Sequence, residues 1–422
     1  MSADNVSEFA IQRYNLTIKN IKLQKNSPSM RNWLLPEYIE DVLPAEAARI
    51  EQLRRRLLDL FASHGYQYVI PPMLEYLESL ITGTGHDLDI ATFKVVDQLT
   101  GRLMGVRADM TPQTARIDAH MLNNQGVTRL CYAASVLRTK PDGLAQTREP
   151  LQVGAELYGH VGVESDIEIQ RLMIKALQAA GIKDLHIDFS HVGIFGSLVK
   201  ENKLSDALEQ ALYAALQSKD KSAVSQLAKG LDKATHDALV SLTNLNGDAT
   251  ILATAEKILP AAPVIKQALQ DLRKVSEKLA DLGVKVGFDL SELRGYHYHS
   301  GMVFAAYAHG YSGPLALGGR YDEVGSAFGR ARPATGFSLD LRGVVLALPP
   351  AMLPKAIFAP AIAKDEREQV DLIAKIEALR HDGEIVIQEL SGQESHRDEL
   401  NCDRKLERSN ANNNSGWQVV KI

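Results

Sequence analysis

Residues 152–159, with the sequence QVGAELYG, decide the interpretation of this chain, and residues 136–141, VLRTKP, precede them. Both stretches lie within residues 101–160, where short apolar runs alternate with turn-forming residues. That alternation predicts antiparallel strands joined by turns. We therefore expect an antiparallel sheet here, with polar side chains such as Glu156 carried on its strands.

The sequence on both sides of this region predicts helices and further strands. Residues 45–64 have apolar side chains at helical spacing and end at Gly65, which predicts an amphipathic helix. Residues 68–70 give a short strand signal that stops at two prolines. Residues 167–181 predict another helix, which ends at Gly181.

Composition divides the first 350 residues into segments. Residues 1–29 are polar and of mixed charge, and we expect a disordered extension there. Residues 30–195 and 284–350 are expected to form one core, with strand signals running from 284 through 304. Residues 196–283 are rich in Ala, Leu, Lys and Asp and poor in aromatic residues, which predicts a helical insertion.

A proline-marked break precedes a last segment, residues 351–422. A helix is predicted over 365–381 and a final strand over 417–422, with the polar, asparagine-rich stretch 391–416 as a loop between strands. We expect a small α/β C-terminal module. It has 10 Lys and Arg and 13 Asp and Glu, which give it a net charge of −3. A negative net charge does not favour RNA binding.

Composition limits the classes of function. The chain has 422 residues, 45% hydrophobic and 23% charged, and a net charge of −5, all ordinary for a soluble globular protein. Its two cysteines, Cys131 and Cys402, have no C-x-x-C spacing, so we expect a reducing compartment and no structural zinc. There is no apolar run of transmembrane length and no secretory signal, which predicts a cytoplasmic protein without membrane contacts.

Four further motifs have simple structural explanations when each is taken alone. Residues 65–75 (GYQYVIPPMLE) fit a helix C-cap, a strand and a turn, and residues 107–112 (RADMTP) fit helix capping by Asp109 and Thr111. Residues 294–304 (RGYHYHSGMVF) and 318–322 (GGRYD) read as strand ends and glycine turns.

Together with residues 136–159, these motifs resemble those of histidyl-tRNA synthetases in the same order across residues 34–345. The resemblance implies an α+β class II aminoacyl-tRNA synthetase-like fold, with an antiparallel sheet flanked by helices, a helical insertion and a small C-terminal α/β module. The 65–75 segment resembles motif 1, which in that class builds a homodimer interface.

The resemblance also implies a pocket for histidine. A zwitterion needs acceptors around its ammonium and a cation near its carboxylate, and an imidazole N–H needs an acceptor such as Glu156. Asp109 is one methylene shorter than the family's glutamate. The residues that match the family's pocket are Asp109, Thr111, Gln152, Glu156, Arg294, Tyr298, His299 and Tyr321.

The positions that match the family's ATP site are altered. Arg138 remains as a vestigial phosphate contact, but Lys140 replaces the glutamate that recognises adenine, and Gln146 replaces a loop arginine. Gly343 stands where the family has its γ-phosphate arginine, and Asp340 replaces a glycine and would repel phosphates. We therefore expect no adenylation and no catalytic residues.

A retained histidine pocket beside an altered ATP site is similar to the regulatory subunit family of short-form ATP phosphoribosyltransferase. That resemblance implies a non-catalytic subunit without a cofactor, which activates the catalytic subunit in the first step of histidine biosynthesis and mediates feedback inhibition by histidine, an allosteric ligand. It implies a self-dimer within a hetero-octamer. It implies no nucleic-acid partner.

Alternative interpretations are an active histidyl-tRNA synthetase, another amino-acid-activating enzyme, and a histidine sensor without an enzyme partner. A metal site is not expected, because histidines such as His186 and His191 have no ligand-like neighbours in sequence.

Overall fold

The computed structural model describes residues 34–82, 86–141, 147–361, 366–392, 397–409 and 416–422. The expected extension at 1–29 and the motif residue Gln146 lie outside this part of the chain. The chain divides into two compact units, residues 1–41 with 50–349 and residues 42–49 with 350–422, and each is considered by itself.

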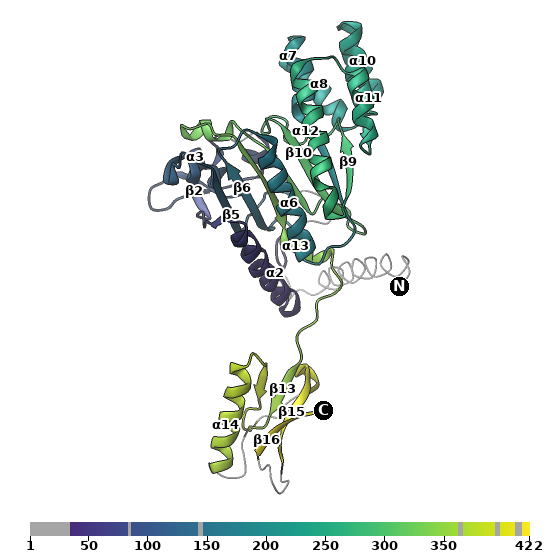
Figure 1. Cartoon of the computed structure of the whole chain (residues 1–422). Helices are drawn as coiled ribbons and strands as arrows, with labels where there is room; N and C mark the ends of the chain where they lie inside the picture. Colours follow the sequence, from purple (N-terminus) through teal and green to yellow (C-terminus); the bar gives the residue numbers. More distant parts are fainter. Residues whose placement is uncertain (1–33, 83–85, 142–146, 362–365, 393–396, 410–415) are drawn as a thin grey trace. The chain divides into compact units, whose positions relative to one another are not determined.

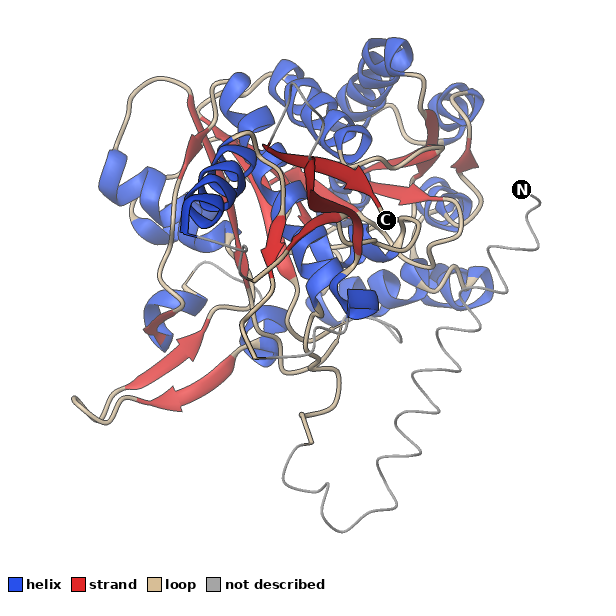
Figure 2. Cartoon of the chain, turned by 90° about the horizontal axis from the view of Figure 1, so that it is seen from below, coloured by secondary structure: helices blue, strands red, loops and turns tan. Residues whose placement is uncertain are grey.

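The larger unit is built on a mixed sheet, whose strand order is β1-β5-β6-β12-β11-β10-β7-β9-β8. The pairs β1–β5 and β7–β9 are parallel, and the other neighbours are antiparallel. The predicted antiparallel sheet flanked by helices is confirmed, with these two parallel pairs as additions (Figures 1 and 2). The strands are β1 Gln67–Tyr68, β5 Thr128–Ser135, β6 Leu151–Tyr158, β7 Leu185–His191, β8 Asn246–Gly247, β9 Lys285–Asp289, β10 Met302–Ala308, β11 Ala316–Arg320 and β12 Ala334–Asp340.

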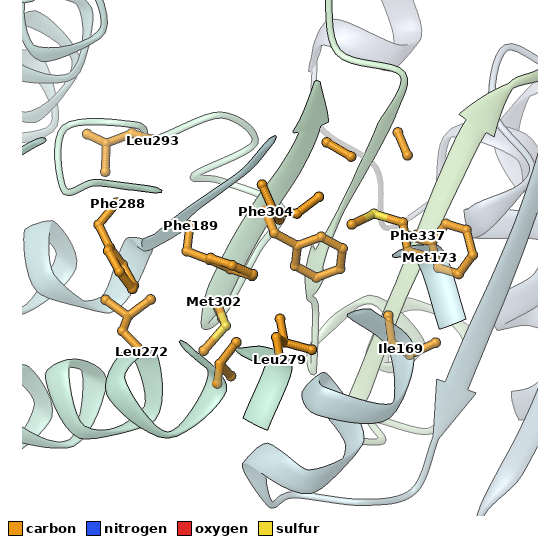
Figure 3. Close-up of a cluster of buried hydrophobic side chains, with 14 of the residues drawn as sticks. Ile169, Met173, Phe189, Leu272, Leu279, Phe288, Leu293, Met302, Phe304 and Phe337 are labelled. Atoms are coloured by element: carbon orange, nitrogen blue, oxygen red, sulfur yellow. The ribbon is translucent and has the colours of Figure 1, made fainter. Parts of the chain in front are cut away.

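Helices pack one face of this sheet and form the core. In α2 (Pro44–Ser63), Leu53, Leu57 and Phe61 repeat every four residues and are buried, and the Phe61 ring meets Phe337 edge-on at 5.9 Å between centroids. The close-up in Figure 3 shows side chains of α6 (Val163–Ala179) and α12 (Pro263–Leu279) meeting phenylalanines of the sheet. This layer fixes the strands so that their other face can carry a site.

The segment between β7 and β9 is mostly helical. Helices α7, α8, α10 and α11 gather at one end of the sheet in Figure 1. Several of these helices begin at an N-capping residue. For example, the side chains of Ser205 before α8 and Asp232 before α10 accept hydrogen bonds from backbone N–H groups in the first turn. The short strand β8 also lies in this segment and pairs with β9. The helices are α7 Val192–Glu201, α8 Asp206–Gln217, α9 Lys221–Leu227, α10 Lys233–Leu242 and α11 Thr250–Ile258.

A second, three-stranded sheet, β2-β4-β3, and several short helices complete this unit. These elements are β2 Leu74–Tyr76, α3 Leu77–Ile81, α4 His86–Ala91, β3 Phe93–Val96, β4 Leu103–Val106, α5 Thr111–Arg116, the π-helix Ile117–Leu122 and α13 Leu341–Leu346.

One strand prediction in the larger unit is wrong. The expected strand run from 284 through 304 is interrupted, because residues 290–301 between β9 and β10 form turns. Gly295 has φ +64°, and its carbonyl accepts the N–H groups of Tyr298 and His299. His297 and His299 therefore lie in this turn segment and not on a strand.

The smaller unit contains a four-stranded sheet of order β14-β13-β15-β16 and helix α14 (Glu366–His381). The predicted loop 391–416 is wrong in part, because β15 lies within it. Its sequence, CDRKLERS, buries only Leu406 and is held by ion pairs such as Arg404–Glu384 at 2.8 Å, so it lacks the apolar alternation that signals a strand. The other strands are β13 Ala356–Ala359, β14 Val386–Gln388 and β16 Gly416–Lys421.

Candidate functional site: a buried carboxyl group beside an open cleft

The carboxyl group of Glu156 is the centre of the candidate site. Glu156 lies on β6, and only 1% of the residue is exposed. Its Oε1 accepts hydrogen bonds from Thr111 Oγ1 at 3.0 Å and Tyr132 Oη at 2.9 Å. Its Oε2 accepts one from Tyr321 Oη at 2.5 Å. Three hydroxyl groups from three different elements therefore hold one carboxyl group in place.

Burial changes the acidity of this group. Removal from water disfavours the charged carboxylate and raises the pKa of Glu156 to about 8, although the hydroxyl hydrogen bonds act in the opposite direction. A carboxyl group with such a pKa changes its charge near neutral pH. Perturbed titratable groups of this kind are typical of functional sites.

Asp109 and Gln152 form a second polar group beside Thr111. Gln152 Nε2 donates to Asp109 Oδ1 at 2.8 Å, and Gln152 Oε1 accepts the backbone N–H of Met110 at 2.9 Å. Asp109 Oδ1 also accepts the backbone N–H of Thr111 at 3.1 Å. The Gln152 amide is thereby fixed in one orientation, and the half-buried carboxylate of Asp109 is held at the start of α5.

Two rings from the turn after β9 cover the site. Tyr298 stacks on Tyr321, with 5.4 Å between ring centroids, and meets His299 edge-on. The Nδ1 atom of His299 lies 3.2 Å from the carbonyl oxygen of Arg320 and donates to it in the tautomer that fits. Burial lowers the pKa of His299 to about 4, so its imidazole is neutral at pH 7.

Arg320, the neighbour of Tyr321, is anchored on the helical side of the sheet. It is 8% exposed, and its guanidinium donates to Asp166 Oδ2 at 2.8 and 3.1 Å. It also donates to Ser165 Oγ at 2.8 Å and to the carbonyl oxygen of Gly162 at 3.1 Å. These bonds hold the end of β11, and so hold the next residue, Tyr321, against Glu156.

Arg294 is placed differently from the other predicted pocket residues. The structure brings together Asp109, Thr111, Gln152, Glu156, Tyr298, His299 and Tyr321 around one carboxyl group. Arg294 is exposed, and its Nη2 lies 3.4 Å from Glu292 Oε2. It lines two cavities, one with Gln152 and one with His299.

The larger cavity, of about 420 Å³, is a cleft lined by two of the altered motif positions, Asp340 and Gly343. Arg138 and Arg294 bring positive charge to it, and Asp340 brings a carboxyl group whose pKa is raised by burial. Lys140 is exposed and does not line this cleft. The lining residues include Arg138, Thr147, Gln152, Arg294, Tyr311, Ser338, Asp340 and Gly343.

The smaller cavity, of about 120 Å³, lies on the other side of Arg294. Its polar lining is more acidic and includes Asp188, Asp289 and Glu292, with His299 at one wall. Because Arg294 and Leu317 line both cavities, the two spaces are neighbours.

Sequence reasoning missed Tyr132 and Asp166. Tyr132 donates to Glu156, and Asp166 pairs with Arg320. Tyr132 is opposite Gly154 in the register of β5 against β6, and the sequence does not reveal that register. No signal in the sequence placed Asp166 beside a strand so distant in the chain.

The described residues contain neither a cluster of metal ligands nor a membrane-spanning helix. Across these ranges, no three His, Cys, Asp or Glu side chains are grouped so that they could hold a metal ion. None of the described helices has both the length and the apolar composition needed to cross a membrane.

Two family models together match most of this chain. The histidyl-tRNA synthetase family model matches residues 38–344, and the model of the ATP phosphoribosyltransferase subunit HisZ C-terminal domain matches residues 354–420. A solved structure from Bacillus halodurans, described as an ATP phosphoribosyltransferase regulatory subunit/histidyl-tRNA synthetase, is similar with a TM-score of 0.76 and 28% identity. The alignment covers 87% of this chain and 95% of that one.

Curated relatives carry one consistent name. The ATP phosphoribosyltransferase regulatory subunit of Methylobacillus flagellatus is 70% identical over 391 residues, covering 93% of this chain and 99% of the relative. That of Cupriavidus necator is 56% identical over 389 residues, covering 92% and 99%. These relatives are named as regulatory and not as catalytic subunits. With its synthetase-like body and HisZ-type C-terminal module, the chain belongs to the family of ATP phosphoribosyltransferase regulatory subunits.

Proposed function

We propose that this chain activates a short-form ATP phosphoribosyltransferase catalytic subunit and mediates its feedback inhibition by histidine. The observation that carries the proposal is the set of hydroxyl donors that hold the Glu156 carboxyl group, beside a cleft lined by Asp340 and by Gly343, which stands where the synthetases have a phosphate-binding arginine. The names of the relatives support the partner.

In the proposed complex, histidine binds at the Glu156 site. Asp109 and Thr111 supply oxygen acceptors for its ammonium group, and Glu156 supplies an acceptor for an imidazole N–H. Tyr298, His299 and Tyr321 form the walls, and Gln152 holds Asp109 in orientation. Arg294, which is exposed, turns towards the carboxylate of histidine. Arg138 keeps a vestigial phosphate contact.

Regulation would follow from linkage between histidine and the active state of the partner. Suppose that bound histidine disfavours the active arrangement of the catalytic subunit by some factor. The active arrangement then lowers the affinity for histidine by that same factor. Such coupling is typically about 1–3 kcal/mol.

The proposed assembly is a cytoplasmic hetero-octamer that contains a self-dimer formed through the motif 1 face. Exposed apolar side chains in that segment support the dimer, because isolated surfaces seldom leave several such residues together in water. Those residues are Tyr68 at 44%, Ile70 at 75%, Met73 at 45% and Leu74 at 43% exposure. No nucleic-acid partner is proposed.

The test is reconstitution with a purified short-form catalytic subunit. We expect the chain to raise turnover and histidine to reverse the gain. Titration calorimetry is expected to detect histidine binding by the wild type and by Glu164→Gln, an exposed control on α6, but not by Glu156→Ala. Unchanged turnover on addition of the chain would remove the activating role, and equal histidine binding by all three proteins would remove Glu156 from the pocket.

The rival function is amino-acid activation, which the match to histidyl-tRNA synthetases keeps open. Histidine-dependent exchange of pyrophosphate into ATP separates the two. We expect no exchange by the purified chain, because no arginine stands at position 343 and Asp340 lines the cleft. Exchange above background would favour the synthetase.

A further inference from the structure

Gly343, Asp340 and Tyr311 lie close together in the lining of the 420 Å³ cleft. Gly343 is buried in the first turn of α13, directly after Asp340 has capped that helix by accepting the N–H of Arg342 at 3.1 Å. Tyr311 comes from the connection between β10 and β11. The two strands and the helix thus bring a glycine and a tyrosine from distant parts of the sequence to one place.

The hydroxyl of Tyr311 occupies the space beside Gly343. A Cβ atom added at position 343 would lie 2.8 Å from Tyr311 Oη, closer than real Cβ atoms approach other heavy atoms, and 3.5 Å from Asp340 Oδ2. The ring carbon that carries the hydroxyl would be 3.6 Å away, an ordinary contact. The obstruction is therefore a single oxygen atom.

That oxygen is held in place. The Tyr311 side chain is partly buried and packs against the main hydrophobic core, so moving the hydroxyl means removing the ring from its packing. Asp340 is held equally well, because its Oδ1 accepts the backbone N–H groups of both Leu151 and Arg342 at 3.1 Å. Neither group can leave without breaking other contacts.

The charges in the cleft are also unequal. Arg138 and Arg294 are its cationic lining residues, whereas the group nearest to position 343, apart from Tyr311, is the carboxyl group of Asp340. A ligand with one anionic group can meet the arginines. A chain of phosphates that extended to Gly343 would meet a tyrosine hydroxyl and an acid in place of a cation.

We propose that Tyr311 is a specificity-determining residue of this cleft, whose hydroxyl fills the place of a side chain at position 343 and excludes ligands with a terminal phosphate. Restoring an arginine at position 343 is then insufficient for triphosphate binding, because the tyrosine has to be removed as well. The inference concerns the cleft alone and does not depend on the proposed response to histidine.

Thermal unfolding of the full chain tests the contact. Gly343→Ala should lower the Tm in the Tyr311 background, and the same change combined with Tyr311→Phe should lower it far less, because the phenylalanine ring keeps the packing without the oxygen. Equal losses of Tm in both backgrounds would overturn the steric part of the proposal.

Titration calorimetry with MgATP tests the exclusion. We expect no measurable binding by Gly343→Arg and at least tenfold tighter binding by Tyr311→Ala combined with Gly343→Arg. Circular dichroism and a cooperative thermal unfolding transition, measured on the same samples, identify variants that fold. Equal ATP affinity of the two folded variants would overturn the specificity role, whatever the result with histidine. If the alanine variant does not fold, Tyr311→Phe with Gly343→Arg takes its place under the same criterion.

Discussion

Tyr298 and Tyr321 stack with 5.4 Å between their ring centroids, but only one of their two hydroxyl groups is used. Tyr321 Oη donates to Glu156, whereas Tyr298 Oη is buried and has no hydrogen-bond partner among the described residues. A buried hydroxyl without a partner costs free energy on folding. A bound ligand can supply the hydrogen bond that the folded chain does not give to this oxygen.

Replacing Tyr298 with phenylalanine should therefore separate stability from binding. The unfolding free energy is expected to stay level or rise by up to about 1 kcal/mol, since the change removes an unsatisfied group. Histidine affinity should fall about tenfold, the cost of one hydrogen bond. Urea unfolding and calorimetry on the same protein check both results. A clear loss of stability with unchanged affinity would show that the hydroxyl has a structural role only.

The raised pKa of Glu156 predicts a slope in stability against pH. The folded chain keeps the proton up to a pKa of about 8, whereas the unfolded chain loses it near 4.5. Between these values the folded state binds more protons, so its stability falls as pH rises, at most by about 1.4 kcal/mol per pH unit from this group. Urea unfolding from pH 5 to 8 should show a smaller slope for Glu156→Gln. An identical slope would mean that Glu156 titrates normally.

Asp166→Ala should destabilise the chain strongly. It leaves the guanidinium of Arg320, which is 8% exposed, with only the longer contact to Asp322 at 3.3 Å, and loss of the main partner of a buried pair costs about 3–5 kcal/mol. Glu164→Ala on the same helix removes an exposed pair with Lys274 and should cost less than about 1 kcal/mol. Denaturant unfolding compares the two. Similar losses from both variants would show that burial does not decide the strength of these pairs.

Gly154→Ala tests the close packing behind Glu156. A Cβ there would lie 2.5 Å from Tyr132 Oη and 2.6 Å from the carbonyl oxygen of Phe337, and the second atom belongs to the backbone of a neighbouring strand. We expect a loss of about 1–3 kcal/mol or more, with weaker histidine binding as Tyr132 shifts away from Glu156. Gly126→Ala, where nothing lies within 4 Å, serves as the control. Equal unfolding midpoints for the two variants would contradict the tight packing.

The site was predictable from the sequence as far as its residues belong to local motifs. Glu156, Gln152 and Thr111 lie in short motifs with fixed spacing. Gln152 and Glu156 lie on the same face of β6, and Thr111 at the start of α5 contacts Glu156. Tyr132 escaped notice because its role depends on the register of β5 against β6. Arg294 was expected beside the others, but the turn at Gly295 leads its side chain to the surface.

The fold shows the same division between local and long-range information. Helix α2 was predicted within a residue at each end, because the burial of Leu53, Leu57 and Phe61 follows directly from their spacing. Strand β15 was predicted as loop, because its polar residues are paired with partners elsewhere in the module, such as Glu384, and no local pattern records such pairs.

The two cavities share one wall, made by Arg294 and Leu317. A single guanidinium can satisfy an anion on only one side at a time, so an occupant that attracts it to one chamber withdraws positive charge from the other. An anion that binds Arg294 from the larger cavity would then remove positive charge from the acidic groups of the smaller one, Asp188, Asp289 and Glu292, without any movement of the sheet.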